Sequence, residues 1–429
     1  MDNLFDSFAT VRKSATVLAS SSDKERKEAL IRIAEALSAR KAEIFRENSQ
    51  DLDAAEKSGI PDQILHRLAF SEEKLRSATT GLRELSALAD PVGRVREKRE
   101  LDPGFILEKR TFPIGVIGMI FEARPDALVQ IAGLCLRSGN GIILKGGKEA
   151  RLTNRKLVEV IQDATKDCTF GSSWILGIES HEDVDVLLKA EGYVDLLIPR
   201  GSNAFVRHVM DNTRIPVMGH ADGICTTYVD KEADLEKAIP VCVDAKVNYP
   251  AACNATETFL VHSAIASRFL PALNKALGEK GVRIHADSSA LPYMAGAVAA
   301  TYNDFHMEYL ALECAVKVVD SLQEAVEHIQ AHGSHHTDAI LTKDKAAADY
   351  FVAHVDSADV FVNCSTRFAD GFRFGLGAEV GISTSKLHAR GPVGLDGLMT
   401  TKWILTGNGE TVTEYSGPDG KSFHHKELM

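Results

Sequence analysis

The sequence predicts an α/β protein of more than one domain, in which parallel β-sheets are covered by helices on both faces. In two long stretches of the chain, short strands that are apolar throughout alternate with amphipathic helices, a pattern typical of buried parallel sheets. The chain has 429 residues, which is too long for one ordinary hydrophobic core. Two α/β domains joined near residue 225 are the economical interpretation.

The first ninety residues or so are expected to be helical. Apolar residues recur at helical spacing from Leu30 to Ile44, and after an interruption at Gly59–Pro61 a second helical stretch runs from Leu65 to Leu85. The segment Val92–Thr111 is charged, and its residues alternate in strand-like fashion on both sides of an Asp-Pro-Gly turn signal. This pattern predicts an extended hairpin. With little core of its own, this hairpin is expected to pack on another surface.

Two series of strands follow. The first comprises Ile114–Ile120, Gly141–Leu144, Trp174–Ile178, Val194–Ile198 and Ile215–Met218, with helices between them. The second starts near Ile224 and comprises Thr258–Val261, Val282–His285, Val316–Val319, Ala339–Leu341 and Val360–Asn363. The stretch Phe368–Gly397 is rich in glycine and is expected to be loop, and Thr400–Thr406 is expected to be a late strand.

Composition excludes several classes of protein. With 45% hydrophobic and 25% charged residues, the chain is not a disordered one. The net charge of −11 argues against a nucleic-acid binder. No apolar run is long enough for a membrane span and the N-terminus lacks a signal-peptide core, so a cytoplasmic protein is expected. Seven cysteines without a CxxC pair argue against a disulfide framework, and the histidines near His332 lack partners at metal-ligand spacing.

Cys253 is the candidate nucleophile. It lies in KVNYPAACNATETFLVH, among small alanines, with Asn248 upstream and an apolar strand following. Small neighbours let a substrate approach the sulfur, and a thiolate in such a position is a good acyl acceptor. The alternative is a buried structural cysteine, which is the usual state of this residue and the one expected for the other six.

Two segments at strand ends suit anions, and strand ends are where ligands bind in parallel sheets. Lys145 ends a strand and is followed by two glycines and Lys148. Arg200, Gly201 and Ser202 follow another strand and open a helix, whose free N–H groups suit a phosphate. The alternatives are a solvated turn and a simple serine N-cap. The usual GxGxxG fingerprint of dinucleotide-binding sheets does not occur at the first strand.

Taken together, several segments resemble the gamma-glutamyl phosphate reductase family of the aldehyde dehydrogenase superfamily. They are FPIGVIGMIFEARPD, LKGGKEA, IPRGSNAFVRHV, KVNYPAACNATETFLVH, GSHHTDAILTKD and FGLGAEVGISTSKLHARGPVGLDGL, and they cover nearly the whole chain. The resemblance implies an aldehyde dehydrogenase-like fold with three parts. These are a Rossmann-like cofactor-binding domain at 1–91 and 113–224, an oligomerisation hairpin and tail at 92–112 and 400–429, and a catalytic domain at 225–399.

The resemblance also implies catalytic residues. The catalytic cysteine of the superfamily lies in N-x-G-Q-x-C, and Asn248 and Cys253 match this motif, whereas Pro250 and Ala251 do not. Its oxyanion asparagine, in P-W-N, lines up with Arg124. The charge and bidentate geometry of an arginine suit a substrate carboxylate or phosphate at that place.

For the cofactor, the resemblance implies residues at both anion-binding segments. The ribose-binding lysine of K-P-x-E corresponds to Lys145, the Gly-Ser pair near the pyrophosphate to Gly201 and Ser202, and the ribose-binding glutamate of E-x-F-G-P-V to Glu308. Lys145 and Lys148 offer positive charge where a ribose 2′-phosphate could sit. The expected cofactor is therefore NADP(H) rather than NAD(H).

One departure from the superfamily bears on the direction of the reaction. Oxidative members carry a general-base glutamate in E-L-G-G-K, whereas the corresponding stretch Pro216–Gly223 contains no glutamate. That base activates the water that hydrolyses the thioester, and a reductase needs a thioester shielded from water. The missing glutamate favours reduction, and His220 is the first alternative base.

The implied activity is NADPH-dependent reduction of L-glutamyl 5-phosphate to L-glutamate 5-semialdehyde and phosphate through a cysteine thioester, the second step of proline biosynthesis from glutamate. The resemblance further implies a homo-oligomer, with the upstream glutamate kinase as an expected partner. One alternative is another acylating aldehyde dehydrogenase that uses a different acyl phosphate or an acyl-CoA. The other is a nucleotide-binding or scaffold protein that has kept the fold and lost activity.

Overall fold

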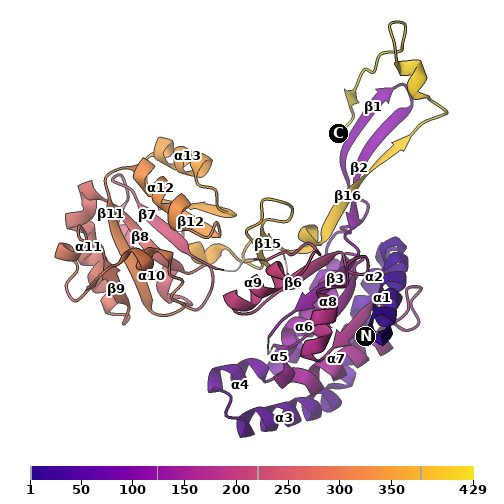
Figure 1. Cartoon of the computed structure of the whole chain (residues 1–429), viewed down its shortest axis with the longest axis horizontal. Coiled ribbons are helices and arrows are strands. Elements are labelled where there is room, and N and C mark those ends of the chain that lie inside the picture. Colours follow the sequence, from indigo (N-terminus) through magenta and orange to yellow (C-terminus); the bar gives the residue numbers. More distant parts are fainter. Residues whose placement is uncertain (1, 123, 220–221, 377–378) are drawn as a thin grey trace.

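The computed structural model describes residues 2–122, 124–219, 222–376 and 379–429. Two α/β units lie side by side, and a long β-sheet projects away from them (Figure 1). We call them the N-terminal unit, which contains a four-stranded sheet, and the C-terminal unit, which contains a seven-stranded sheet. None of the helices in the described ranges is both long and apolar enough to cross a membrane.

Five helices begin the N-terminal unit. They are α1 (Asp2–Ser20), α2 (Asp23–Ala39), α3 (Lys41–Lys57), α4 (Asp62–Leu68) and α5 (Glu72–Ala87). Ser22 and Ser71 cap α2 and α5, since each hydroxyl accepts a hydrogen bond from a backbone N–H of the first turn. Two buried arginines tie these helices to the rest of the unit: Arg26 pairs with Asp90 at 2.8 Å and Arg137 with Asp23 at 2.6 Å.

The four-stranded sheet of this unit is parallel throughout. Its order is β5 (Ile175–Ile178), β4 (Gly141–Lys145), β3 (Val116–Ile120) and β6 (Leu196–Pro199). The helices of this unit that follow are α6 (Pro125–Arg137), α7 (Arg151–Thr165), α8 (His181–Leu187) and α9 (Asn203–Asp211). This alternation confirms the predicted fold class, because β3, β4 and β6 are buried along their whole length.

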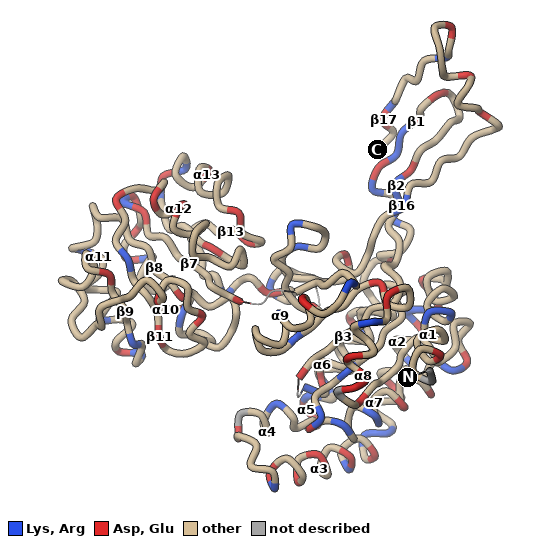
Figure 2. The backbone as a smooth tube through the Cα atoms, in the orientation of Figure 1, with Lys and Arg blue, Asp and Glu red and all other residues tan. Residues whose placement is uncertain are grey.

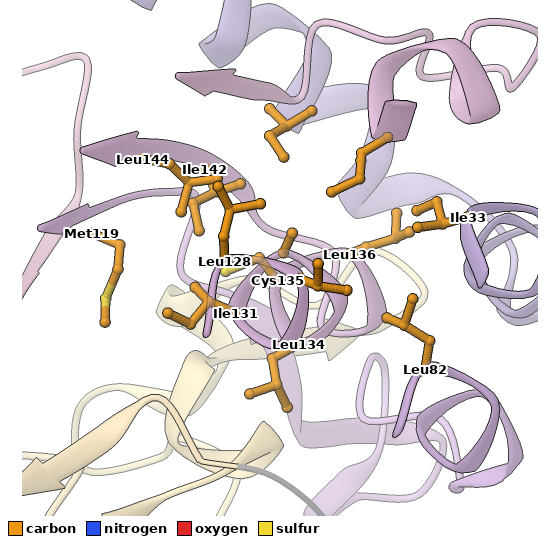
Figure 3. Close-up of a cluster of buried hydrophobic side chains, with 14 of the residues drawn as sticks. Ile33, Leu82, Met119, Leu128, Ile131, Leu134, Cys135, Leu136, Ile142 and Leu144 are labelled. Carbon is orange, nitrogen blue, oxygen red and sulfur yellow. The ribbon is translucent and has the colours of Figure 1, made fainter. Parts of the chain in front are cut away.

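Helix α6 lies at the centre of the main hydrophobic core (Figure 3). Its Leu128 and Ile131 belong to one cluster with Ile142 and Leu144 of the sheet and with Leu82 of α5. Helix α6 is therefore buried on most of its circumference, as its largely apolar sequence indicates. Val380, Ala389, Val393, Leu395 and Leu398 also belong to this core, although the sequence places them in the range of the other domain.

The C-terminal unit contains a seven-stranded parallel sheet. Its order is β10 (Val298–Ala299), β9 (Arg283–Ala286), β11 (Glu313–Val319), β8 (Thr256–His262), β7 (Cys225–Val229), β12 (Thr337–Leu341) and β13 (Asp359–Val362). The helices of this unit are α10 (Leu235–Val247), α11 (Ser263–Gly278), α12 (Leu322–His332) and α13 (Lys345–His354). After β13 the chain forms mostly loop, as expected, with one short pair of strands, β14 (Gly381–Ser383) and β15 (Gly391–Val393).

The projecting sheet is antiparallel. Strands β1 (Val95–Asp102) and β2 (Phe105–Pro113) form the expected hairpin, and β16 (Met399–Thr406) pairs with β2 along its whole length. The short β17 (Lys426–Glu427) covers the other edge. Lysines and arginines are interspersed with acidic residues along β1 and β2 (Figure 2). Most side chains of the sheet are at least partly exposed.

One predicted strand does not form. The segment Ile215–Met218 was expected to close the first series, but it makes a single bridge, between Val217 and Leu197 of β6. Pro216 has no N–H to donate, so it cannot extend a ladder of backbone hydrogen bonds. Strand β6 is therefore the edge of the sheet among the described residues.

Two histidines of α12 belong to a cluster of aromatic rings. His328 and His332 stack with ring centroids 4.2 Å apart, Phe305 meets His328 edge-on, and His306 lies within hydrogen-bonding distance of His332, with ring nitrogens 2.8 Å apart. His328 is buried, and neither ring nitrogen has a partner among the described residues. Burial, followed by the charges of His332, Lys317 and His306, lowers the pKa of His328 to about 3.

This depressed pKa predicts a loss of stability in acid. Between pH 6.5 and about 3 the unfolded chain binds a proton at residue 328 that the folded chain does not, so each pH unit in this range costs up to about 1.4 kcal/mol of unfolding free energy. In His328→Leu the fall of melting temperature from pH 6.5 to 4.5 should be shallower than in the wild type. The matched control is His354→Leu, at an exposed position, which should leave the slope unchanged. Equal slopes in wild type and His328→Leu would contradict this assignment.

Candidate active site

Cys253 lies in the turn that joins α10 to β8. All seven cysteines are free thiols, and five of them are buried, whereas Cys253 and Cys364 are partly accessible. Burial raises the pKa of the Cys364 thiol, which disfavours its reactive form. Accessibility therefore distinguishes Cys253 from the buried cysteines. The charges of two nearby arginines distinguish it from Cys364.

The turn that carries Cys253 is fixed from several sides. Lys246 in the last turn of α10 and Glu257 at the start of β8 form a fully buried ion pair, with 2.5 Å between Nζ and Oε2. The Cys225 thiol donates to the Cys253 carbonyl at 3.2 Å, and Asn254 Nδ2 donates to the Ala369 carbonyl at 2.7 Å. Gly223 lies directly against the Cys253 backbone, where any Cβ would overlap it. Such closely held backbone keeps the thiol in one place.

Two arginines carry charge near this thiol. Arg200 follows β6 in the N-terminal unit, and Arg367 lies in a short 3-10 turn after β13 in the C-terminal unit. Each is partly buried and interacts electrostatically with Cys253. Burial lowers the pKa of both guanidinium groups, and the neighbouring Arg124 and Arg373 respectively lower it further. Arginine nevertheless stays charged in proteins, so the thiol faces positive charge from both units.

A cavity of about 700 Å³ opens beside Arg200. Helix α5 forms one wall, the start of α6 a second, and the loop around Phe372 a third. Its walls carry both signs of charge, including Arg124, Asp126 and Glu379. Burial raises the pKa of Glu379, whose carboxylate accepts a hydrogen bond from the Gly371 N–H. Such a lining suits a small polar molecule with groups of both charges.

The other two predicted catalytic residues are exposed. Arg124 lies at the entrance of α6, 54% exposed, and its guanidinium reaches Asp126 at 3.2 Å. Asn248 ends α10, and its side-chain amide makes no hydrogen bond with the part of the chain that the structure describes. The structure thus brings Arg124 to the 700 Å³ cavity and leaves the Asn248 amide available to a ligand. His220 lies outside the described residues.

Lys145 and Lys148 stand at the carboxyl end of β4. Lys145 is buried, and burial lowers its pKa while the carboxylates of Glu149 and Asp183 act in the opposite direction. Lys148 is exposed in a 3-10 turn after two glycines. These glycines border a smaller pocket of about 320 Å³ between α7 and the sheet, lined by neither Cys253 nor Arg200. A buried lysine beside open backbone is a reasonable anion site.

The second cofactor segment lies at the carboxyl end of β6. Ser202 caps α9 by accepting a hydrogen bond from the Phe205 N–H. The next residue, Asn203, donates from Nδ2 to Glu308 at 2.8 Å and to Asp222 at 2.8 Å. Gly201, Ser202 and Glu308, predicted separately from distant parts of the sequence, are therefore neighbours across the two units. Arg200, predicted with Gly201 and Ser202 as part of a phosphate site, lines the 700 Å³ cavity.

Sequence reasoning missed Arg367, Glu379 and the buried pair Lys246–Glu257. Arg367 is far from Cys253 in the sequence, and only the order of the strands in the sheet brings the two residues into the same region. Lys246 and Glu257 are visible as charged residues at the ends of apolar segments, a signal that could have indicated a buried pair. Within the described residues, no cluster of three or more metal-ligating side chains is arranged to hold a metal ion.

The model of the aldehyde dehydrogenase family matches residues 6–298. The chain therefore belongs to the aldehyde dehydrogenase family, a family of oxidoreductases.

Within that family its relatives are gamma-glutamyl phosphate reductases. The enzyme of Pelotomaculum thermopropionicum is 51% identical over 97% of this chain and 96% of its own length, and that of Nostoc punctiforme is 49% identical over the same shares. The crystal structure of the gamma-glutamyl phosphate reductase of Thermotoga maritima, 37% identical, superposes with a TM-score of 0.93 and covers 95% of this chain and 99% of its own. The chain is thus one of the gamma-glutamyl phosphate reductase group.

Proposed function

We propose that this protein reduces L-glutamyl 5-phosphate to L-glutamate 5-semialdehyde and phosphate with NADPH, through a thioester on Cys253, as the second step of proline biosynthesis from glutamate. The observation that carries the mechanism is the accessible Cys253 thiol between positive charges from both units. The near-full-length similarity to gamma-glutamyl phosphate reductases supports the substrate.

Cys253 is the nucleophile in this proposal. Its thiolate attacks the carbonyl carbon of the acyl phosphate, and phosphate leaves with the electrons of the broken C–O bond. The exposed amide of Asn248, five residues upstream, is the donor that stabilises the carbonyl oxygen as negative charge develops. Arg124 at the cavity binds the carboxylate of the substrate's amino-acid end, which the mixed charges of the lining accommodate.

The residues at the ends of β4 and β6 suit a dinucleotide. Lys145 and Lys148 supply positive charge, and Glu308 offers carboxylate oxygens to a ribose. Gly201 and Ser202 precede α9, and the N–H groups of its first turn that Ser202 does not cap remain for a pyrophosphate. A nicotinamide cofactor held there would supply the hydride. The two lysines favour NADP(H), because a 2′-phosphate adds negative charge at that place.

Self-association is also part of the proposal. Strand β16 presents Trp403 and Leu405, each about half exposed, on the projecting sheet. Exposed apolar side chains on a long edge strand favour pairing with another chain. We infer that the projecting sheet joins copies of this protein into a homo-oligomer.

Replacing the nucleophile tests the thioester. Cys253→Ser should fold normally and lose reductase activity by roughly a thousandfold or more, because a hydroxyl is far less nucleophilic than a thiolate at neutral pH. Cys364→Ser, the other partly accessible cysteine, is the matched control and should keep full activity. Turnover of Cys253→Ser above about a tenth of wild type would exclude the thioester mechanism.

Lys145→Ala tests the cofactor site. The substitution should weaken NADPH binding by about 1.5–3 kcal/mol, roughly 10- to 100-fold, and lower turnover at saturating NADPH much less. The measurement is the cofactor dissociation constant by fluorescence titration together with KM. Lys189→Ala, at an exposed position of the same unit, is the control. An unchanged dissociation constant in Lys145→Ala would remove this residue from the cofactor site.

The third test of the proposed function runs the reaction backwards. Because Pro216–Gly223 lacks a glutamate base, the acyl-enzyme should be discharged by phosphate and not by water. Oxidation of the semialdehyde with NADP⁺ should then require inorganic phosphate and yield glutamyl phosphate. NADPH formation is followed with and without phosphate in a non-phosphate buffer. Equal rates, with free glutamate as the product, would point to a hydrolytic enzyme.

A further inference from the structure

The position of Arg367 beside Cys253 is set by hydrogen bonds on both sides of its own short turn. Asn254, which follows Cys253, donates to the carbonyl of Ala369, and the hydroxyls of Thr256 and Thr366 lie 3.1 Å apart. The Arg367 guanidinium lies over the ring of Tyr249, 5.9 Å from its centroid. The turn that carries the nucleophile and the turn that carries Arg367 are thus one hydrogen-bonded assembly.

Within the described ranges, neither Arg367 nor Arg200 is in direct contact with a carboxylate, because Glu379 and Asp126 act on Arg200, and Asp370 and Asp244 on Arg367, only from beyond ion-pair distance. The Nε of Arg367 is buried without a hydrogen-bond partner, and in the described chain neither guanidinium forms an ion pair. Most arginines near the surface of this protein do form such pairs, for example Arg155 with Glu179. A partly buried cation whose carboxylates lie beyond ion-pair distance is only partly compensated, and an anionic ligand adds a direct partner.

We propose that Arg200 and Arg367 together form the subsite for the phosphoryl group of the acyl-phosphate substrate. Both guanidinium groups, one from each unit, act electrostatically on Cys253, and a substrate whose carbonyl carbon lies at the sulfur has its phosphoryl group one bridging oxygen away. Guanidinium groups bind phosphate oxygens bidentately. Arg124, which lines the same cavity as Arg200, is left for the carboxylate at the other end of the substrate.

The subsite acts in the acyl-transfer half of the reaction only. The Cys253 sulfur forms a bond to the carbonyl carbon, the bond from that carbon to the phosphoryl oxygen breaks, and the electron pair leaves with phosphate. No oxidation or reduction occurs in this step. The two arginines stabilise the charge that develops on the leaving phosphate, and in reverse they hold phosphate for attack on the thioester.

This inference rests on the proposed function. Measuring the reverse reaction distinguishes a failure of the phosphate subsite from a failure of the proposed function. Mixing enzyme with semialdehyde and NADP⁺ without phosphate should give one burst of NADPH per Cys253, because acylation needs no phosphate. Adding phosphate should start steady turnover. In Arg367→Gln and Arg200→Gln the burst should keep its amplitude and rate, whereas the KM for phosphate should rise about 10- to 100-fold.

Two further variants make the result specific. Arg367→Lys keeps the charge and is expected to fold like the wild type, but it lacks the bidentate geometry, so its KM for phosphate should lie between those of wild type and Arg367→Gln. Arg268→Gln removes an exposed positive charge from helix α11 of the same unit and should change the KM for phosphate by less than about twofold, since exposed charges are screened.

Each other outcome overturns the assignment in a recognisable way. A normal burst with an unchanged KM for phosphate in both glutamine variants would show that these arginines bind no phosphate. A slower burst with unchanged KM for phosphate would show that they serve the thiolate instead. A raised KM for the semialdehyde alone would assign them to the substrate carboxylate. No burst in the wild type would refute the thioester itself, and with it both proposals.

Discussion

The buried ion pair between Lys246 and Glu257 is the contact on which the geometry of the reactive cysteine depends. It joins the last turn of α10 to the first residues of β8, and the turn with Cys253 spans the gap between them. Burial raises the pKa of Glu257 to about 7 even beside the lysine, so the pair is costly to assemble. Removing one partner of such a pair costs about 3–5 kcal/mol, because an uncompensated charge stays buried. The thiol therefore has a fixed place relative to the sheet.

From this fixed point the site is completed by the other unit. Arg200 and Ser202 are two residues apart after β6, yet Arg200 lines the large cavity while Ser202 caps the helix beside Glu308. In the proposed function, one strand end of the N-terminal unit thus serves both the substrate and the cofactor. The charge of Arg200 acts on the thiol of the C-terminal unit, so residues of both units contribute to the proposed site.

How far the sequence predicts this arrangement depends on whether a feature is local. The apolar strands Gly141–Leu144 and Thr258–Val261 were predictable, because a strand buried on both faces is apolar throughout. Cys253 was predictable from its small neighbours. Arg367 was not, because its proximity to the thiol arises from the order of strands in the sheet. The segment Ile215–Met218 shows that a local pattern can also mislead. It is apolar like a strand, but it contains a proline and forms only a single bridge.

The hydrogen bond from Asn203 to Glu308 has a thermodynamic consequence for ligand binding. In the unliganded chain this carboxylate already accepts a hydrogen bond from the opposite unit, at 2.8 Å. A ribose hydroxyl that binds the same oxygen exchanges one partner for another and gains little enthalpy there, whereas binding the second oxygen adds a contact and keeps the units joined. If Glu308 binds the cofactor as proposed, the amide of Asn203 competes for this carboxylate oxygen and moderates the affinity there.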